Sequence, residues 1–407
     1  MKTLTRLTIN KFRNVAPTTL EFRPGINVLL GRNAAGKTTL LRLMSSLLGR
    51  TDAAPRDELL DVSFHVKGDL FELDQTTLQV HADTPALPIE MSRRGASPFP
   101  STYQVDSLIF TQGSEPVLKA ELSPNEVVIE RKGAQRRITR PMKGAPIQSL
   151  VASLWSTPQD ADLRNLTAGF LSAQVDTAGR MDESLESFHS LLRLEVQEEG
   201  AVRSWSLFGG VPRSMFELAP PPIPEGTTAT FQVAFLDRVA QVLGYESATA
   251  RFDVERVTPE PNRHVLYLSK LKFYFTRAGE QVSHEWLSYG QKRLLAFFAH
   301  ADASPDIVIA DELVNGLHHE WISACLDELH GRQAFLTSQN PLLLDFLRFD
   351  STEDVRRTFI LCERAQTESG EQLIWRNLTE DEAESFFLAY QTGIQRVSDI
   401  LLTKGLW

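Results

Sequence analysis

The chain alternates between stretches with two different periods of apolar residues. Residues 60–140 consist of short pieces such as LDVSFHV and YQVDSLIF, in which apolar and polar positions alternate. This period of two is typical of an antiparallel sheet with one buried face. Residues 286–407 instead alternate helical spacing with short apolar runs such as DIVIA, and the first 50 residues have the same texture. The pattern predicts an α/β fold with an antiparallel β subdomain.

The length of the chain, 407 residues, predicts two or three lobes rather than one simple core. The stretch MDESLESFHSLLRLEVQE places Leu185, Phe188, Leu192 and Val196 on one helical face. The proline-rich FELAPPPIPEG and a second helical stretch, TFQVAFLDRVAQVLG, follow it. We expect a first lobe at 1–145, a helical insertion at 146–249 and a second lobe at 250–407.

Composition favours a soluble, cytoplasmic protein. Hydrophobic residues make up 42% and charged residues 23%, which is an ordinary globular balance. No apolar run approaches the roughly 20 residues of a membrane span, and MKTLTRLTINKF has no signal-peptide core. The two cysteines are too few for a disulfide framework. The net charge of −10 argues against a protein that coats nucleic acid, but ERKGAQRRITRPMK at 130–143 holds six cations and one acid. Two interpretations of this run remain open: a local basic face that binds nucleic acid or an acidic partner, and a solvated hairpin.

The stretch GRNAAGKT at 31–38 matches the phosphate-loop pattern G-x-x-x-x-G-K-[ST]. It follows the apolar strand INVLL and precedes a helix, which is the setting that the motif requires. The glycines allow a tight turn of N–H groups around phosphate, and the helix start adds partial positive charge. Lys37 is expected to contact the β and γ phosphates, and Thr38 to hold Mg²⁺. The predicted ATP-binding residues of this loop are Gly31, Arg32, Asn33, Ala34, Ala35, Gly36, Lys37, Thr38 and Thr39.

The stretch DIVIADE at 306–312 is an apolar strand that ends in two carboxylates. Adjacent acids at the end of a buried strand are costly unless a cation or a reacting water needs them. In a protein with a phosphate loop, Asp311 is expected to hold Mg²⁺, and Glu312 to orient or deprotonate the attacking water.

The stretch WLSYGQKRLLAFF at 286–298 resembles the L-S-x-G-Q signature of ABC-type ATPases, through Leu287, Ser288, Gly290 and Gln291. It is a second helix start that suits an anion. The opening LTINKFRNVAPTTLEFRPGINVLLGRNAAGKTTLL is similar to stand-alone ATPases related to the overcoming-lysogenisation-defect (OLD) proteins, RecF and the SMC-like repair ATPases. ADELVNGLHHEWI is similar to the OLD-like branch. The resemblance covers roughly the first 50 and the last 125 residues, and it implies the fold of an ABC-type P-loop NTPase.

The resemblance also implies a mechanism. Two protomers would sandwich two ATP molecules, so that Ser288, Gly290 and Gln291 of one protomer contact the nucleotide of the other. The resemblance is also compatible with oligomers larger than this dimer. Arg13, in the NKFR turn, matches a position beside the nucleotide. Gln112, at the end of the strand SLIF and before a glycine, is the candidate for a glutamine that contacts Mg²⁺ and water.

The chain departs from the family in LTSQNPLLL at 336–344. The family has a histidine that bonds the γ-phosphate where this chain has Gln339, our third predicted catalytic residue beside Lys37 and Glu312. A glutamine amide can donate to phosphate but cannot become cationic. The substitution predicts slow hydrolysis. Asn340 and Pro341 predict a helix start.

Three functions remain open. OLD proteins that cut DNA carry an additional nuclease domain at this end, but only 67 residues follow Asn340 here, without a second set of clustered acids. We therefore expect a sensor or regulatory ATPase that acts through a separate nuclease or toxin, in a system such as antiphage defence. A RecF-like repair ATPase that binds duplex DNA through the basic face is one alternative, and a nucleotide-gated scaffold with little hydrolysis is the other.

Overall fold

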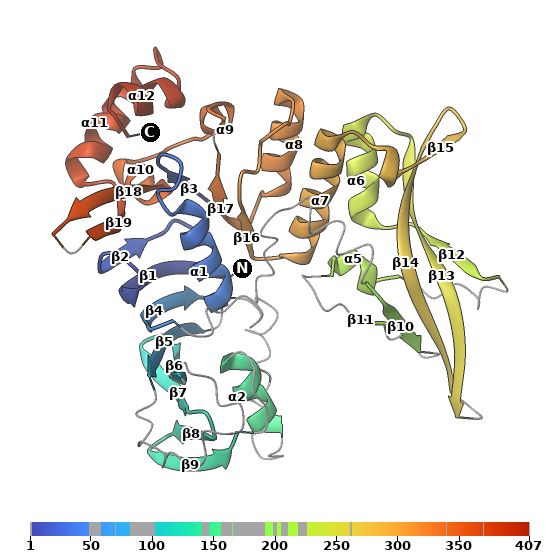
Figure 1. Cartoon of the computed structure of the whole chain (residues 1–407), viewed down its shortest axis with the longest axis horizontal. Helices are drawn as coiled ribbons and strands as arrows, with labels where there is room; N and C mark the ends of the chain where they lie inside the picture. Colours follow the sequence, from blue (N-terminus) through green and yellow to red (C-terminus); the bar gives the residue numbers. More distant parts are fainter. Residues whose placement is uncertain are drawn as a thin grey trace, which may run out of the picture. The chain divides into compact units, whose positions relative to one another are not determined.

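The alternation of apolar residues in the first 140 positions corresponds to a sheet in the computed structural model of the chain (Figure 1). The structure describes residues 2–48, 58–69, 71–81, 102–140, 146–155, 165, 192–197, 202–204, 211–218, 226–260, 263–338, 340–368 and 370–406. These residues belong to two compact units. Unit 1 comprises Met1–Gln174 and Phe349–Trp407, and unit 2 comprises Val175–Arg348. The predicted division at 146 and 250 is a different partition of the chain and stays a prediction.

Unit 1 contains an eight-stranded sheet in the order β2-β1-β4-β5-β6-β7-β8-β9, and every neighbouring pair is antiparallel. Its strands are β1 (Thr3–Phe12), β2 (Thr18–Glu21), β4 (Leu60–Lys67), β5 (Glu72–His81), β6 (Thr102–Gln112), β7 (Glu115–Leu122), β8 (Glu126–Arg131) and β9 (Ala134–Thr139). Alternate residues are buried, as in β4, where Leu60, Val62, Phe64 and Val66 belong to the core. The predicted antiparallel subdomain is thus confirmed. Helix α2 (Pro146–Trp155) follows in the same unit.

The second sheet region of unit 1 positions the phosphate loop. Strand β3 (Ile26–Leu30) pairs in parallel with β18 (Phe359–Thr367), and β18 pairs antiparallel with β19 (Gly370–Asn377). Helix α1 (Lys37–Leu48) begins directly after the loop that leaves β3. The last helices of the chain are α10 (Thr352–Thr358), α11 (Glu380–Gln391) and α12 (Val397–Thr403).

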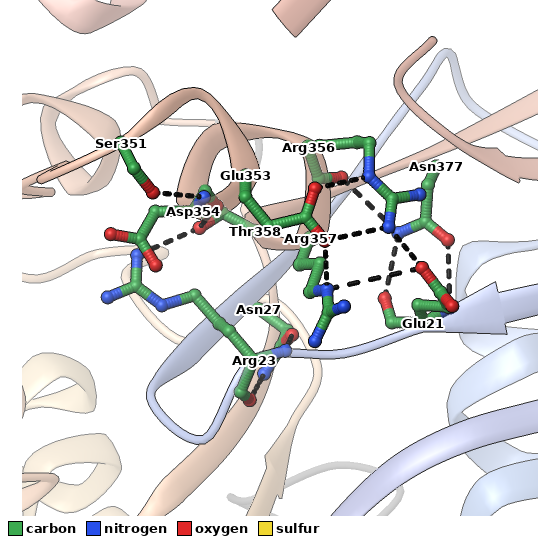
Figure 2. Close-up of polar contacts among 10 residues, drawn as sticks. All are labelled: Glu21, Arg23, Asn27, Ser351, Glu353, Asp354, Arg356, Arg357, Thr358 and Asn377. Atoms are coloured by element: carbon green, nitrogen blue, oxygen red, sulfur yellow. Dashed lines mark hydrogen bonds and ion pairs between the residues drawn. The ribbon is translucent and has the colours of Figure 1, made fainter. Parts of the chain in front are cut away.

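A network of charged and amide groups fastens α10 to β2 and β19 (Figure 2). Arg356 forms ion pairs with both Glu353 and Glu21, and Arg357 lies beside the same two carboxylates. The Asn377 amide donates to the Glu21 carbonyl and accepts from the Glu21 N–H, both at 2.8 Å. The hydrogen bond from Arg356 is the main cause that lowers the pKa of Glu353 to about 2. The segment before β3 is therefore held to the chain's last strand and to α10.

Unit 2 contains the second parallel strand pair. Strands β16 (Ile307–Ala310) and β17 (Gln333–Thr337) run side by side with Ala310 opposite Leu336. Their carboxyl ends lie at one edge, so that the residues after Ala310 lie beside the end of β17. The helices of this region are α7 (Tyr289–Ala303), α8 (His319–Glu328) and α9 (Leu342–Asp345).

An antiparallel sheet in the order β11-β10-β14-β13-β12 completes unit 2, with β15 beside β14. Its strands are β10 (Leu194–Gln197), β11 (Val202–Ser204), β12 (Thr228–Phe231), β13 (Ser247–Glu260), β14 (Arg263–Arg277) and β15 (Glu280–Ser283). The long β13–β14 hairpin is yellow in Figure 1. The turn at Ala278 and Gly279 between β14 and β15 has positive φ angles of 50° and 80°, as a two-residue hairpin turn requires. Helices α5 (Arg213–Phe216) and α6 (Ala234–Leu243) and the short η4 (His284–Trp286) accompany the sheet.

The prediction of a helical insertion at 146–249 is corrected in part. Among the described residues, α2, α5 and α6 are helical, but β10, β11 and β12 are strands of the unit 2 sheet. Val196 lies in β10 rather than on a helical face, because sheet pairing with Leu266 of β14 outweighs the local helical spacing. The predicted helical positions Leu185 and Phe188 lie outside the described residues. No helix among the described residues has the length and apolar character that crossing a membrane requires.

Candidate functional site

The phosphate loop of unit 1 needs glycine at two positions. Gly31 has a φ of +140°, and a Cβ there would lie 2.1 Å from the carbonyl oxygen of Cys362 on β18. Gly36 has a φ of +87°, and its Cβ would lie 2.9 Å from Leu373 Cδ1 on β19. At Gly31 the opposing atom is backbone, so a side chain would displace the loop. At Gly36 the end of the Leu373 side chain could shift, and it is the positive φ that favours glycine there. The structure thus gives a physical reason for the two glycines of the predicted motif.

Lys37 lies over this loop. Its Nζ donates to the carbonyl oxygen of Gly31 at 2.6 Å and to that of Arg32 at 3.0 Å. The Ala35 N–H closes a turn onto the Arg32 carbonyl at 3.2 Å, and Ala34 adopts a positive φ of 63°. The ammonium group, the loop backbone and the start of α1 therefore converge on one small region. Asn33 and Thr38 are exposed there, and Thr39 is half-buried.

Trp375 of β19 forms a wall beside the loop that the motif did not predict. Its side chain is 1% exposed, and its indole Nε1 donates to the Ala35 carbonyl at 3.4 Å. The ring also lies 6.5 Å from the Phe12 ring, centroid to centroid. Two backbone hydrogen bonds join Leu373 to Asn14 and Ala16. The turn that follows β1 therefore lies next to the phosphate loop.

Arg13 is part of that turn, so the structure places its backbone near the predicted nucleotide site. Its φ of 47° is unusual for a residue with a side chain. The guanidinium forms a fork with the Glu58 carboxylate, with two N–O distances of 2.6 Å. This hydrogen bonding raises the pKa of Arg13. The side chain is thus committed to Glu58, and its predicted contact with nucleotide stays a prediction.

Gln112 lies at the other end of the eight-stranded sheet. Phe12, before the Arg13 turn, pairs with Leu60, which pairs with Gln79. The opposite end of β1, at Thr3, leads through β4 and β5 to Thr111, the neighbour of Gln112. The side chain is exposed in the β6–β7 hairpin turn. The structure does not bring Gln112 to the phosphate-loop end of the sheet, so the geometry does not support a role in holding Mg²⁺.

The acidic strand end of unit 2 is organised by Thr337. The Thr337 hydroxyl donates to Asp311 Oδ1 and accepts from the backbone N–H of Glu312 at 2.6 Å. Thr337 is 1% exposed. The register of β16 and β17 places it there, at the common edge of the two strands. One buried hydroxyl therefore orients the carboxylate of Asp311 and the backbone of Glu312.

The backbone of Glu312 is held in a conformation that few residues with side chains adopt. Its φ is 51°, and its Oε2 accepts from Asn315 Nδ2 at 2.7 Å. A side chain in the left-handed region costs free energy, which the surrounding contacts must offset. Such conformations occur where a side chain must point in a fixed direction. Asn315 therefore helps to hold the Glu312 carboxylate within the same protomer.

The signature stretch begins α7 with a complete capping box. Ser288 Oγ accepts from the Gln291 N–H at 3.4 Å, and the Gln291 side chain accepts from the Ser288 N–H at 2.9 Å. A Cβ on Gly290 would lie 2.7 Å from the Gly316 carbonyl oxygen. Glycine at 290 therefore allows the start of α7 to approach the turn after the acidic strand. Trp286, which precedes the motif, and Tyr289, which lies within it, are 83% and 58% exposed.

Gln339 lies outside the described residues, so its predicted catalytic role stays a prediction. On either side of it, the Ser338 hydroxyl donates to the Asn340 carbonyl, and Asn340 Oδ1 accepts from the Leu342 N–H at 3.0 Å. Asn340 thus has the helix-start role that was predicted.

The described residues contain no group of three or more His, Cys, Asp or Glu side chains arranged around a metal. His318 and His319 instead lie against the rings of Trp321 and Phe346, at 5.1 and 4.9 Å between ring centroids. An Asp carboxylate and a Thr hydroxyl are the hard oxygen donors that Mg²⁺ prefers. Thr38 in unit 1 and Asp311 in unit 2 each carry a donor that suits this ion by chemistry.

Comparison with known proteins agrees with these features. Residues 6–92 match a family described as "AAA domain", and residues 114–345 match one described as "AAA domain, putative AbiEii toxin, Type IV TA system". The chain is 51% identical over 49 residues to the DNA replication and repair protein RecF of Psychromonas ingrahamii, a match that covers 12% of this chain and 14% of the relative. It is 35% identical over 80 residues to RecF of Deinococcus radiodurans, covering 19% of this chain and 22% of the relative. The matched stretches thus span less than a quarter of these curated relatives.

Solved structures similar to this chain include an SMC head domain and a recombination mediator protein. The SMC head domain from Thermotoga maritima has 11% identity and a TM-score of 0.37, covering 91% of this chain and 97% of that one. The recombination mediator RecF with ATPrS, from the RecFOR pathway, has 14% identity and a TM-score of 0.33, covering 93% and 98%. The family match at 114–345 covers more than half of the 407 residues. The chain therefore belongs to this AAA-domain family of P-loop ATPases.

Proposed function

We propose that the chain binds ATP with Mg²⁺, dimerises around the nucleotide, hydrolyses it and thereby regulates a separate effector protein. The observation that carries ATP binding is the phosphate loop, where two obligatory glycines and the Lys37 ammonium converge at the start of α1. A loop of this kind presents N–H groups and positive charge to a polyphosphate.

The other residues take roles that follow from their chemistry. Lys37 neutralises charge on the β and γ phosphates. Thr38 and Asp311 are each proposed as ligands of Mg²⁺, which would neutralise charge on the phosphate oxygens. Glu312 orients and deprotonates the attacking water. Ser288 and Gly290, at the capped start of α7, contact the γ-phosphate bound to the other protomer.

ATP binding is tested by Lys37→Ala. The loss of the ammonium group should weaken ATP binding by about 100-fold or more, because the β and γ phosphates lose a charge-assisted hydrogen-bond donor. Titration of a fluorescent ATP analogue measures the affinity. Arg42→Ala, which removes an exposed cation from the same helix, is the matched control and should bind as the wild type does. Wild-type affinity in Lys37→Ala would show that the loop is not the nucleotide site.

The sandwich is tested by Glu312→Gln. This variant keeps the side-chain shape but cannot accept a proton from water, so ATP should persist and the dimer should accumulate. Size-exclusion chromatography with ATP and Mg²⁺ is expected to show a dimer that ADP does not produce. A profile that is identical with and without ATP would contradict dimerisation around nucleotide.

Several features support a regulatory role in a two-component system. ADELVNGLHHEWI resembles the OLD-like branch, and the family description of residues 114–345 includes a toxin of a type IV toxin–antitoxin system. Co-purification of the tagged chain with the product of the adjacent gene tests this role. A neighbour that neither binds the chain nor changes its ATPase rate would argue against it.

The similarity to RecF favours a second candidate, a repair ATPase that binds duplex DNA. Arg136 and Arg137 are exposed on β9, the edge strand of the eight-stranded sheet. DNA-stimulated ATP hydrolysis that falls steeply with salt, and that a double Arg136→Ala, Arg137→Ala variant loses, would support this candidate. Hydrolysis that is indifferent to DNA would exclude it.

A further inference from the structure

Arg293 of α7 is a buried cation with no role in the proposed binding and hydrolysis of ATP. It lies one turn beyond the signature glycine, and only 5% of the residue is exposed. Full burial of an arginine is uncommon because its charge and five N–H donors must all be satisfied. Its partners therefore indicate what holds it there.

The guanidinium donates to the turn that carries the predicted catalytic carboxylate. Nη2 donates to the Glu312 carbonyl and, at 3.4 Å, to the Asp311 carbonyl. Nε donates to the Leu313 carbonyl, also at 3.4 Å. The three acceptors are the main-chain carbonyl oxygens of three consecutive residues, Asp311, Glu312 and Leu313. A planar fork of donors fixes such a turn in a way that a single ammonium cannot.

The same guanidinium also reaches back to the signature motif. Nη1 donates to the Tyr289 hydroxyl at 3.3 Å. Tyr289 lies between Ser288 and Gly290, so Arg293 joins the residue at the centre of the signature to the turn at Glu312. The close approach of Gly290 to Gly316 brings the same two segments together on the backbone.

The conformation of Glu312 makes this connection consequential. With a φ of 51°, its backbone depends on surrounding hydrogen bonds, and Arg293 supplies one to its carbonyl. If the turn relaxed, the Glu312 side chain would point elsewhere, although the Ser288–Gln291 capping box would still hold the start of α7. Loss of the Arg293 contacts should therefore change the direction of the Glu312 carboxylate, while the signature motif still binds nucleotide.

We propose that Arg293 is a positioning residue that couples occupancy of the signature motif to the aim of Glu312. This inference rests on the proposed ATPase function and adds its regulation. When phosphate of the partner's nucleotide contacts the Ser288–Gly290 segment, any shift of Tyr289 reaches the Glu312 turn through the guanidinium. Hydrolysis thus depends on a completed sandwich.

The test is Arg293→Met, which preserves side-chain length and removes the donors. We expect kcat to fall about 100-fold, because a misaimed catalytic group costs about that much. KM and the affinity for ATP should change less than about threefold. As in Glu312→Gln, the ATP-bound dimer should accumulate in size-exclusion chromatography, which a variant with general structural damage would not show.

Arg332→Met is the matched control. Arg332 is also largely buried in unit 2, and it donates to a main-chain carbonyl, that of Ala301, at 2.6 Å. It contacts neither the signature nor the Glu312 turn through these bonds, so kcat should stay within about threefold of the wild type.

Two milder variants guard against misfolding of Arg293→Met. Arg293→Lys keeps the charge without the fork and should lose about tenfold in kcat. Tyr289→Phe removes the hydroxyl that accepts from Arg293 and should lose a few-fold in kcat.

Each outcome decides the proposal. Wild-type kcat in Arg293→Met, or in both Arg293→Lys and Tyr289→Phe if the first does not fold, overturns it. So does a loss of kcat that comes with an equal loss of ATP affinity and no dimer. Absence of ATP hydrolysis by the wild-type protein would instead overturn the proposed function, and the coupling with it.

Discussion

At the scale of single residues, Thr337 is the group whose removal should most directly disturb the acidic strand end. Thr337→Val keeps the shape of the side chain but leaves the Asp311 carboxylate and the Glu312 N–H without the hydroxyl that joins them. We expect kcat to fall about tenfold and the Mg²⁺ concentration for half-maximal hydrolysis to rise, because Asp311 loses its orientation. Titration of the ATPase rate with Mg²⁺ measures both. An unchanged Mg²⁺ dependence would show that Thr337 only packs.

Ser338→Ala is the control for Thr337→Val. Ser338 is the next residue, and its hydroxyl donates to the Asn340 carbonyl. Its loss should leave the Mg²⁺ dependence of the wild type in place.

The comparison of these residues with the motifs shows what a sequence can predict at this scale. Gly31, Lys37, Asp311 and Glu312 were predictable because local chemistry fixes their spacing. Thr337 was not, since its role depends on the register between two parallel strands rather than on its neighbours in the chain. Its only signal is a polar residue at the end of an apolar strand. The sequence contains even less indication that Trp375 lies beside the phosphate loop, because an apolar strand residue usually belongs to a core.

At the scale of elements, strand β6 carries a buried carboxyl that should make stability depend on pH. Asp106 has no exposed surface, and it accepts hydrogen bonds from Thr77 at 2.8 Å and from Gln104 at 2.9 and 3.0 Å. Burial raises the pKa of Asp106 from 3.8 to about 6. In the unfolded chain the group loses its proton first. Stability from this group is therefore complete below about pH 4 and is lost as the pH rises through about 6.

Asp106→Asn removes this titration while preserving the side-chain shape. Between pH 4 and pH 7.5, the free energy of unfolding of the wild type should fall by on the order of 2 kcal/mol relative to that of the variant. Thermal unfolding at several pH values measures the shift. A constant difference across this range would contradict the raised pKa.

Element types were predictable where a segment has one clear period. The alternation over 60–140 predicts strands such as β4, β7 and β8 because buried residues recur at every second position in each of them. The prediction of a helix around Val196 is wrong for the converse reason. Its apolar spacing fits a helix, but β14 offers an edge with which Leu194–Gln197 can pair, and that partner lies about 70 residues away in the chain.

At the scale of the whole molecule, the order of motifs along the chain does not follow the division into units. The phosphate loop belongs to unit 1, whereas the signature and the acidic strand belong to unit 2, and the chain returns to unit 1 at Phe349. No composition shift marks this return. Strand β18 makes it necessary, because β3 needs a parallel partner and Phe359–Leu361 provides it. Local patterns do not contain that information.

The arrangement in which one protomer completes the site of another can be tested by mixing two inactive variants. Lys37→Ala lacks a working phosphate loop, and Ser288→Arg places a bulky cation at the start of α7. If sites form between protomers, a mixed dimer contains one site with both defects and one with neither. Equal mixing should then restore about a quarter of the wild-type ATPase rate, because half of the dimers are mixed and each holds one intact site of two.

The controls for this mixture separate complementation from residual activity. Each variant alone, at the same total concentration, should hydrolyse less than about a hundredth of the wild-type rate, since each removes a group that the phosphates require. A mixture of Lys37→Ala with Glu312→Gln should not recover in the same way, because both defects affect residues that serve the ATP bound by their own protomer. In that mixed dimer each site retains one defect. Absence of recovery in the first mixture would mean that Ser288 serves the nucleotide of its own protomer, and that the sandwich is wrong for this chain.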